Sequence, residues 1–95
     1  MKDFYFNSVS QNQYTVVLNN TAGDGYICLN QNCNNNNKKL FISEKIFLSF
    51  TISEIKCIHF YSTKNLFFDL KIKNKKANDV MEEINFGHNY INITQ

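Results

Sequence analysis

The sequence predicts a mainly β domain, a seven-stranded antiparallel barrel or sandwich capped by a C-terminal α-helix at about residues 74–86. Three observations lead to this fold class. Short apolar runs separated by polar loops recur from the N-terminus to Lys73. After Asn74 the apolar spacing changes from every second residue to a helical pattern. Strands do not alternate with long helices, so a parallel sheet is not expected.

The first six strands are apolar runs bounded by polar or glycine-containing loops. We expect them at Asp3–Val9, Gln13–Leu18, Tyr26–Asn30, Lys39–Ser43, Ile46–Ser53 and Ile55–Tyr61. Gly23-Asp24-Gly25 is a strong turn signal between the second and third strands. In the sixth strand we expect Ile58 and Phe60 to point into the core, with a bulge after Ile55.

The seventh strand and the helix have the clearest patterns. Leu66–Lys73 alternates apolar with mostly charged residues, which predicts one buried and one exposed face. Asn74 is a suitable N-cap and Gly87 a suitable stop for the helix that follows. Its apolar stripe has the helical spacing i, i+3, i+4, i+7, at Ala77, Val80, Met81 and Ile84. Two lysines in the first turn, Lys75 and Lys76, oppose the helix dipole.

Length and composition indicate one folded domain, which we place at residues 1–87 with a tail at 88–95. Hydrophobic residues make up 43% of the chain, which argues against disorder. The chain has no apolar run long enough for a transmembrane helix and no apolar signal-peptide segment, so we expect an intracellular protein, cytoplasmic or nuclear. Three cysteines then suggest reduced thiols. Abundant asparagine and lysine, with no proline, arginine or tryptophan, are typical of an AT-rich genome.

A strip of basic and aromatic residues is the best candidate for a binding surface, and it spans the last two strands, the turn between them and the start of the helix. Its members are Lys56, His59, Tyr61, Lys64, Phe67, Lys71, Lys73, Lys75 and Lys76. Such a strip suits an acidic peptide or polyanionic lipid headgroups. The competing explanation is a solvated sheet edge whose lysines prevent strand pairing. Nucleic acid is disfavoured, because the net charge is only +2 and no arginine is available for bidentate contacts to guanine.

Catalytic and metal chemistry find less support. The possible zinc ligands are scattered rather than grouped in close pairs, at Cys28, Cys33, Cys57, His59 and His88. Cys57 and His59 share a strand face and could form a nucleophile–base pair, but the sequence shows neither an orienting acid nor an oxyanion donor. We therefore predict no catalytic residues, no metal and no cofactor, and a protein that is not an enzyme.

Seven strands with a closing C-terminal helix resemble the pleckstrin-homology (PH) superfold. The segment Phe50–Ile58, followed by the hairpin 65–73 and the segment 74–86, is similar to the second half of such domains. Two short motifs, Phe50-Thr51-Ile52-Ser53 and Ile55-Lys56-Cys57, are similar to the PH domain of the core transcription factor IIH subunit. In that family a basic residue two positions beyond the cysteine helps to hold acidic peptides, and here His59 occupies that position. Phosphoinositide-binding members cluster basic residues in the first loop, but Asn7–Gln13 contains none.

These observations predict a small intracellular binding module whose partner is a protein. Two alternatives remain open. One is binding to phosphoinositide headgroups at a membrane surface. The other is a small oligomeric structural protein, for which the outward-facing Phe41, Phe47 and Phe67 would supply the contacts.

Overall fold

The computed structural model describes residues 2–7, 9, 11–30, 39–62 and 64–91, and within them all regular structure is β. Eight strands follow one another along the chain. They are β1 (Lys2–Tyr5), β2 (Gln13–Ala22), β3 (Gly25–Leu29), β4 (Leu40–Ile42), β5 (Phe47–Ile52), β6 (Cys57–Tyr61), β7 (Leu66–Lys75) and β8 (Met81–Ile91). The prediction of a mainly β chain therefore fits.

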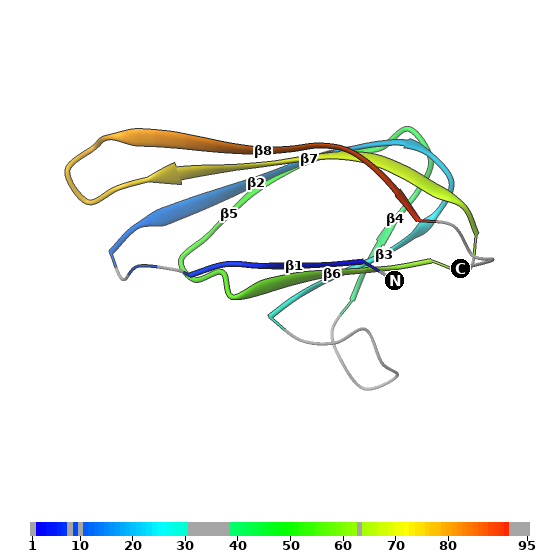
Figure 1. Cartoon of the computed structure of the whole chain (residues 1–95), viewed down its shortest axis with the longest axis horizontal. Helices are drawn as coiled ribbons and strands as arrows, with labels where there is room; N and C mark the ends of the chain where they lie inside the picture. Colours follow the sequence, from blue (N-terminus) through cyan, green and yellow to red (C-terminus); the bar gives the residue numbers. More distant parts are fainter. Residues whose placement is uncertain (1, 8, 10, 31–38, 63, 92–95) are drawn as a thin grey trace.

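The strands form two four-stranded antiparallel sheets that pack as a sandwich (Figure 1). We call the sheet with strand order β1-β6-β3-β4 sheet A, and the sheet with order β5-β2-β7-β8 sheet B. Five consecutive pairs of strands run from one sheet into the other, and three of these crossings share one end of the sandwich: β2 into β3, β4 into β5 and β6 into β7. These three crossings lie together at one end of the molecule, which we call the corner, and the turn between β7 and β8 lies at the opposite end (Figure 1).

The core lies between the two sheets and follows the alternation of the strands. The inward residues of β7, Leu66, Phe68, Leu70 and Ile72, are at most 1% exposed. Ile58 and Phe60 of β6 are fully buried, which confirms their predicted orientation. The rings of Phe60 and Phe68 stack across the sandwich with centroids 4.1 Å apart. Such aromatic pairs add stabilisation beyond their buried area.

The predicted helix at about 74–86 is wrong, and the residues assigned to it form the end of β7, a turn and most of β8. Acids of β8 lie across from lysines of β7, so that Lys73 faces Glu83 in the register. In a helix, Lys75 and Lys76 would oppose the dipole, whereas in the hairpin the lysines gain carboxylate partners. The apolar residues that were predicted to form one helical face are separated in the hairpin. Ala77 and Val80 lie in the turn, and Met81 and Ile84 lie on the edge strand β8.

Two backbone hydrogen bonds close the turn between β7 and β8. The backbone N–H of Lys76 donates to the carbonyl of Val80 at 2.8 Å, and that of Asp79 donates to the carbonyl of Lys76 at 3.0 Å. Asp79 has a φ of 65°, a left-handed conformation that aspartate tolerates better than most residues. This is a three-residue hairpin loop ending in a left-handed residue.

Beyond the predicted domain end at residue 87, β8 continues in register with β7. Ile91 pairs with Leu66 and is 4% exposed. Residues 88–91 therefore belong to sheet B. No helix in the described ranges is both long and apolar enough to cross a membrane.

One cysteine differs from the prediction of reduced thiols. Cys28, on β3, is disulfide-bonded, whereas Cys57 is a free thiol. Cys33 lies outside the described residues. Reduced thiols were expected to follow from an intracellular location. The Cys28 disulfide does not fit that expectation, because disulfides persist mainly in oxidising compartments.

Candidate binding site

Five of the nine predicted site residues lie along the β7–β8 hairpin, and three of its four lysines form ion pairs with carboxylates. Lys71 contacts Glu83 at 3.0 Å, Lys75 contacts Asp79 at 3.6 Å, and Lys76 contacts Glu82 at 2.6 Å. Residues 66–91 contain four lysines and four carboxylates, so the formal charge of the hairpin is zero. A strip that looks basic in the sequence is a mixed-charge surface in the fold.

Lys56 and Lys64 do not join that strip. They bracket β6 in sheet A, whereas the other four lysines lie on or directly after β7 in sheet B. Lys56 pairs with Glu54 at 3.3 Å, and Lys64 lies 4.0 Å from Asp24. Both side chains are about 70% exposed, so these pairs contribute little to stability.

The predicted aromatic residues and His59 are also divided between the two sheets. Tyr61 lies beside Tyr26 on sheet A, with ring centroids 6.4 Å apart. Phe67 stacks on Tyr90 across β7 and β8 of sheet B, with centroids 4.4 Å apart. His59 is 4% exposed on sheet A. The structure therefore does not bring the nine residues together into one surface.

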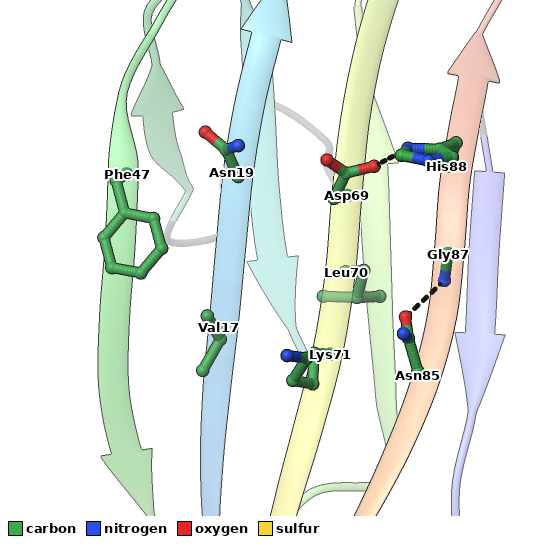
Figure 2. Close-up of a pocket in the computed structure, with 9 residues that line it drawn as sticks. All are labelled: Val17, Asn19, Phe47, Asp69, Leu70, Lys71, Asn85, Gly87 and His88. Atoms are coloured by element: carbon green, nitrogen blue, oxygen red, sulfur yellow. Dashed lines mark hydrogen bonds and ion pairs between the residues drawn. The ribbon is translucent and has the colours of Figure 1, made fainter.

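A shallow groove of about 320 Å³ crosses sheet B at a β-bulge (Figure 2). The register of β7 and β8 shifts between Leu70 and Lys71, opposite Gly87. Gly87 adopts a φ of 70°, and its N–H donates to the Asn85 side-chain oxygen at 2.8 Å. His88 pairs with Asp69 at one end of the groove. Gly87 is the sequence signal for this feature, although its position predicted a helix end.

The edge formed by β8 is the second feature that the sequence did not show. Within the described residues, β8 pairs with β7 alone, so it is one of the two edge strands of sheet B, the other being β5. Met81 is 56% exposed and Ile84 46% exposed, although Ile84 lies directly across from the buried Ile72. The helix prediction placed both residues on a buried stripe, so nothing in the sequence indicated an exposed edge strand.

The edge strand β8 of sheet B lies beside β1, one of the two edge strands of sheet A. Phe86 of β8 contacts Phe4 of β1 with ring centroids 5.0 Å apart, and contacts Phe6 at 5.5 Å. Phe6 and Phe86 are only half-buried. We call this side of the sandwich, between β1 and β8, the open side, because side chains rather than backbone hydrogen bonds close it.

The predicted metal ligands do not assemble. Within the parts of the chain that the structure describes, no group of three His, Cys, Asp or Glu side chains is placed to hold a metal ion. His88 lies on β8 of sheet B, whereas Cys28, Cys57 and His59 lie on sheet A.

The outward orientation of the three phenylalanines is confirmed, since Phe41, Phe47 and Phe67 are 44–63% exposed. Phe41 lies on β4 of sheet A, whereas Phe47 and Phe67 lie on sheet B, so they do not form one patch. Met81 and Ile84, by contrast, lie together on the edge strand β8.

Comparison with known proteins adds no family to this description, because no protein family, curated protein or solved structure matches the chain. The resemblance to PH domains stays a prediction.

Proposed function

We propose that this chain is a small binding module that engages a protein partner by accepting an extended segment along β8. The observation that carries the proposal is the free edge of this eleven-residue strand, bordered by exposed apolar side chains. A strand at a sheet edge presents unpaired N–H and C=O groups, which an extended segment of another chain can pair with.

Side chains near the edge favour a partner segment of alternating apolar residues. A strand added to β8 would place every second side chain on the core side of sheet B. There it would cover Ile84 and the half-buried Phe86. This burial would supply affinity, while the backbone bonds would fix the register.

The ion pairs of the hairpin favour an uncharged partner segment over an acidic one. The lysines that would attract carboxylates or phosphates contact Glu83, Asp79 and Glu82 within 3.6 Å. An anionic ligand would have to break these ion pairs to gain its own. The same argument disfavours lipid headgroups, the alternative that the sequence left open.

The test is selection of peptides from a displayed random library on the folded protein, followed by fluorescence anisotropy with synthetic peptides. We expect selected peptides to contain alternating apolar residues. Ile84→Lys should weaken their binding by about tenfold or more, because a charge at an edge opposes strand pairing. N-methylation of alternate backbone nitrogens in the peptide should abolish binding.

Leu40→Lys is the matched control, because Leu40 is 49% exposed on β4, the edge strand of the other sheet. It should leave the affinity unchanged. Peptides that bind equally well to wild type and Ile84→Lys would refute the assignment of the site to β8. A homodimer in light scattering that Ile84→Lys dissociates would also refute it, because the edge would then be occupied by a second copy.

A further inference from the structure

Three side chains on the outer face of sheet A form a continuous chain of contacts. The Cys57 sulfur lies 3.1 Å from His59 Nε2, and His59 Nδ1 lies 2.7 Å from a carboxylate oxygen of Asp3. Cys57 and His59 are two residues apart on β6, so they share a face. Asp3 reaches them because it lies directly opposite His59 in the pairing of β1 with β6.

The contacts define a role for each group. The Asp3 carboxylate can only accept, so the hydrogen bond assigns the proton of the neutral imidazole to Nδ1. The lone pair of Nε2 then points at the Cys57 sulfur and can take the thiol proton. His59 is 4% exposed, and the ring of Tyr5 stands edge-on to it at 6.3 Å, which limits rotation of the imidazole.

Cys57 is not in a disulfide, and its residue is half-buried. Reactive cysteines combine partial exposure with a neighbouring base, whereas inert ones are enclosed in apolar surroundings. The combination of a nucleophile, a base within hydrogen-bond reach and an acid that orients the base is the arrangement that activates cysteine in nucleophilic chemistry.

We infer that Cys57 is an activated thiol that undergoes thiol–disulfide exchange with small-molecule disulfides. His59 Nε2 takes the thiol proton, and the Cys57 thiolate attacks one sulfur of the disulfide. A new S–S bond to Cys57 forms, the original S–S bond breaks, and the departing thiolate receives the proton from His59. The products are a mixed disulfide on Cys57 and one free small thiol.

Exchange suits this arrangement better than acyl transfer does. Acyl transfer also needs preorganised donors for an oxyanion, whereas exchange needs the thiolate, a proton acceptor and access for the disulfide. This site is on sheet A, on different residues from the β8 edge in sheet B, so the two proposals stand or fall separately.

The experiment measures the rate at which oxidised glutathione modifies Cys57 in the full chain at neutral pH. Trypsin cleaves after Lys56 and Lys64, so the peptide 57–64 contains Cys57 and no other cysteine, and mass spectrometry follows it separately. The reference is the same thiol in chain unfolded by guanidinium. We expect the native thiol to react about tenfold faster than the unfolded one, although folding covers part of it.

Two variants separate the contribution of the base, His59, from that of the positioning residue, Asp3, to the reaction rate. His59→Gln should lower the native rate by about tenfold or more, to that of the unfolded chain or below. Asp3→Asn should lower it by a smaller factor while leaving the melting temperature nearly unchanged, since Asp3 has an exposed position on the edge strand β1. Nitrogen NMR of the His59 ring should show Nδ1 protonated in wild type and a mixture of tautomers in Asp3→Asn, a change that a purely structural role would not produce.

Asp3→Asn keeps the inference testable if the buried His59 cannot be replaced without unfolding. A native rate slower than the unfolded rate would overturn the inference. Equal native rates in wild type and Asp3→Asn, with the His59 tautomer unchanged, would overturn the role of Asp3.

Discussion

The two ends of the sandwich are held together in different ways. At the corner, the chain passes three times between the sheets, and one buried and two partly exposed polar side chains bind the backbone where regular pairing is interrupted. At the opposite end, the β7–β8 hairpin is held by its ladder and by ion pairs that are one third to nine tenths exposed. The corner depends on a few contacts that are costly to lose, whereas the hairpin depends on many that are individually weak.

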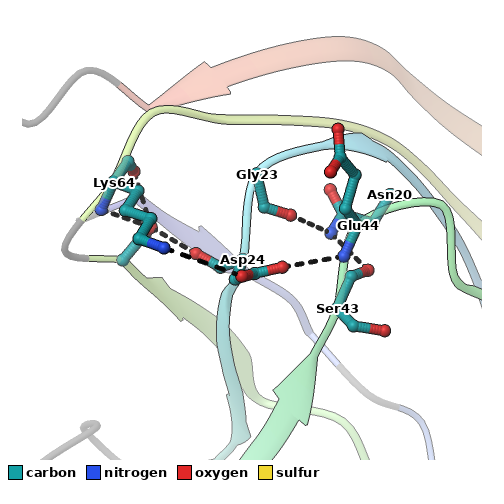
Figure 3. Close-up of polar contacts among 7 residues, drawn as sticks. Asn20, Gly23, Asp24, Ser43, Glu44 and Lys64 are labelled. Atoms are coloured by element: carbon teal, nitrogen blue, oxygen red, sulfur yellow. Dashed lines mark hydrogen bonds and ion pairs between the residues drawn. The ribbon is translucent and has the colours of Figure 1, made fainter.

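Asn20 and Asp24 organise the corner (Figure 3). Asn20 is fully buried, and its side-chain amide donates to the carbonyls of Gly23 and Ser43, both at 2.8 Å. A carboxylate oxygen of Asp24 accepts from the N–H of Glu44 at 2.9 Å. These bonds join the crossing from β2 into β3 to the crossing from β4 into β5.

The third crossing, from β6 into β7, is held by Ser62. Its hydroxyl lies 2.6 Å from the carbonyl of Asp24 and 2.6 Å from that of Lys64, and it accepts from the N–H of Lys64 at 3.0 Å. All three crossings are therefore connected through side chains. The corner thus links the two sheets through side chains, whereas the far hairpin keeps an exposed edge.

The largest expected effect comes from Gly23→Ala at the corner. Gly23 has a φ of 82°, and an added Cβ would lie 1.9 Å from the backbone carbonyl oxygen of Asn65. Two parts of the backbone would have to separate, so we expect a loss of more than about 4 kcal/mol in the free energy of unfolding. Denaturant titration followed by circular dichroism measures this loss.

Gly87→Ala is the matched control in the hairpin. Gly87 also has a positive φ, 70°, but an added Cβ would meet no atom within 4 Å. The cost should be only that of the left-handed conformation, about 1–2 kcal/mol. Equal losses for the two variants would show that the close approach at the corner is not what distinguishes the two ends.

Asn20→Ala should have the next largest effect. It would leave the carbonyls of Gly23 and Ser43 without this donor and create a small cavity. We expect a loss of about 3 kcal/mol, measured by the same denaturant titration. Asn19→Ala changes the neighbouring, exposed residue and should cost less than about 0.5 kcal/mol. A loss below about 1 kcal/mol for Asn20→Ala would contradict the importance given to the corner.

Alternating patterns in the sequence predicted the strands and most of the core. Leu66, Phe68, Leu70 and Ile72 were assigned to the core from their period of two, and all are buried. Period-two alternation over eight residues is specific because a helix would distribute the same residues around its axis.

The helix predicted after Asn74 was wrong because the apolar pattern of this segment is compatible with both a helix and a hairpin. Val80 and Met81 are adjacent at the turn, and Ile84 lies at an edge, so their spacing carried no information about a buried stripe. The decisive contacts, between Lys71 and Glu83 and between Lys76 and Glu82, depend on the register of a hairpin. Single-sequence periodicity does not contain that register.

The candidate sites were only partly predictable for the same reason. Cys57 and His59 were recognised as neighbours on one strand face, because that follows from their spacing. Asp3, which orients His59, is 56 residues away in the sequence and meets it only through the pairing of β1 with β6. Likewise, the lysine strip was seen without the carboxylates that neutralise it.

The smallest expected effect is at the hairpin, in the cross-strand ion pair between Lys71 and Glu83. The two side chains are 38% and 48% exposed, so solvent screens their attraction. A double-mutant cycle with Lys71→Ala and Glu83→Ala should give a coupling of about 0.5 kcal/mol at low salt, decreasing as salt is added. The pair Lys75 and Asp79, at 48% and 86% exposure, should couple still more weakly. A coupling above about 2 kcal/mol would contradict the proposed difference between the two ends, because a single contact of the hairpin would then be as costly to lose as a contact of the corner.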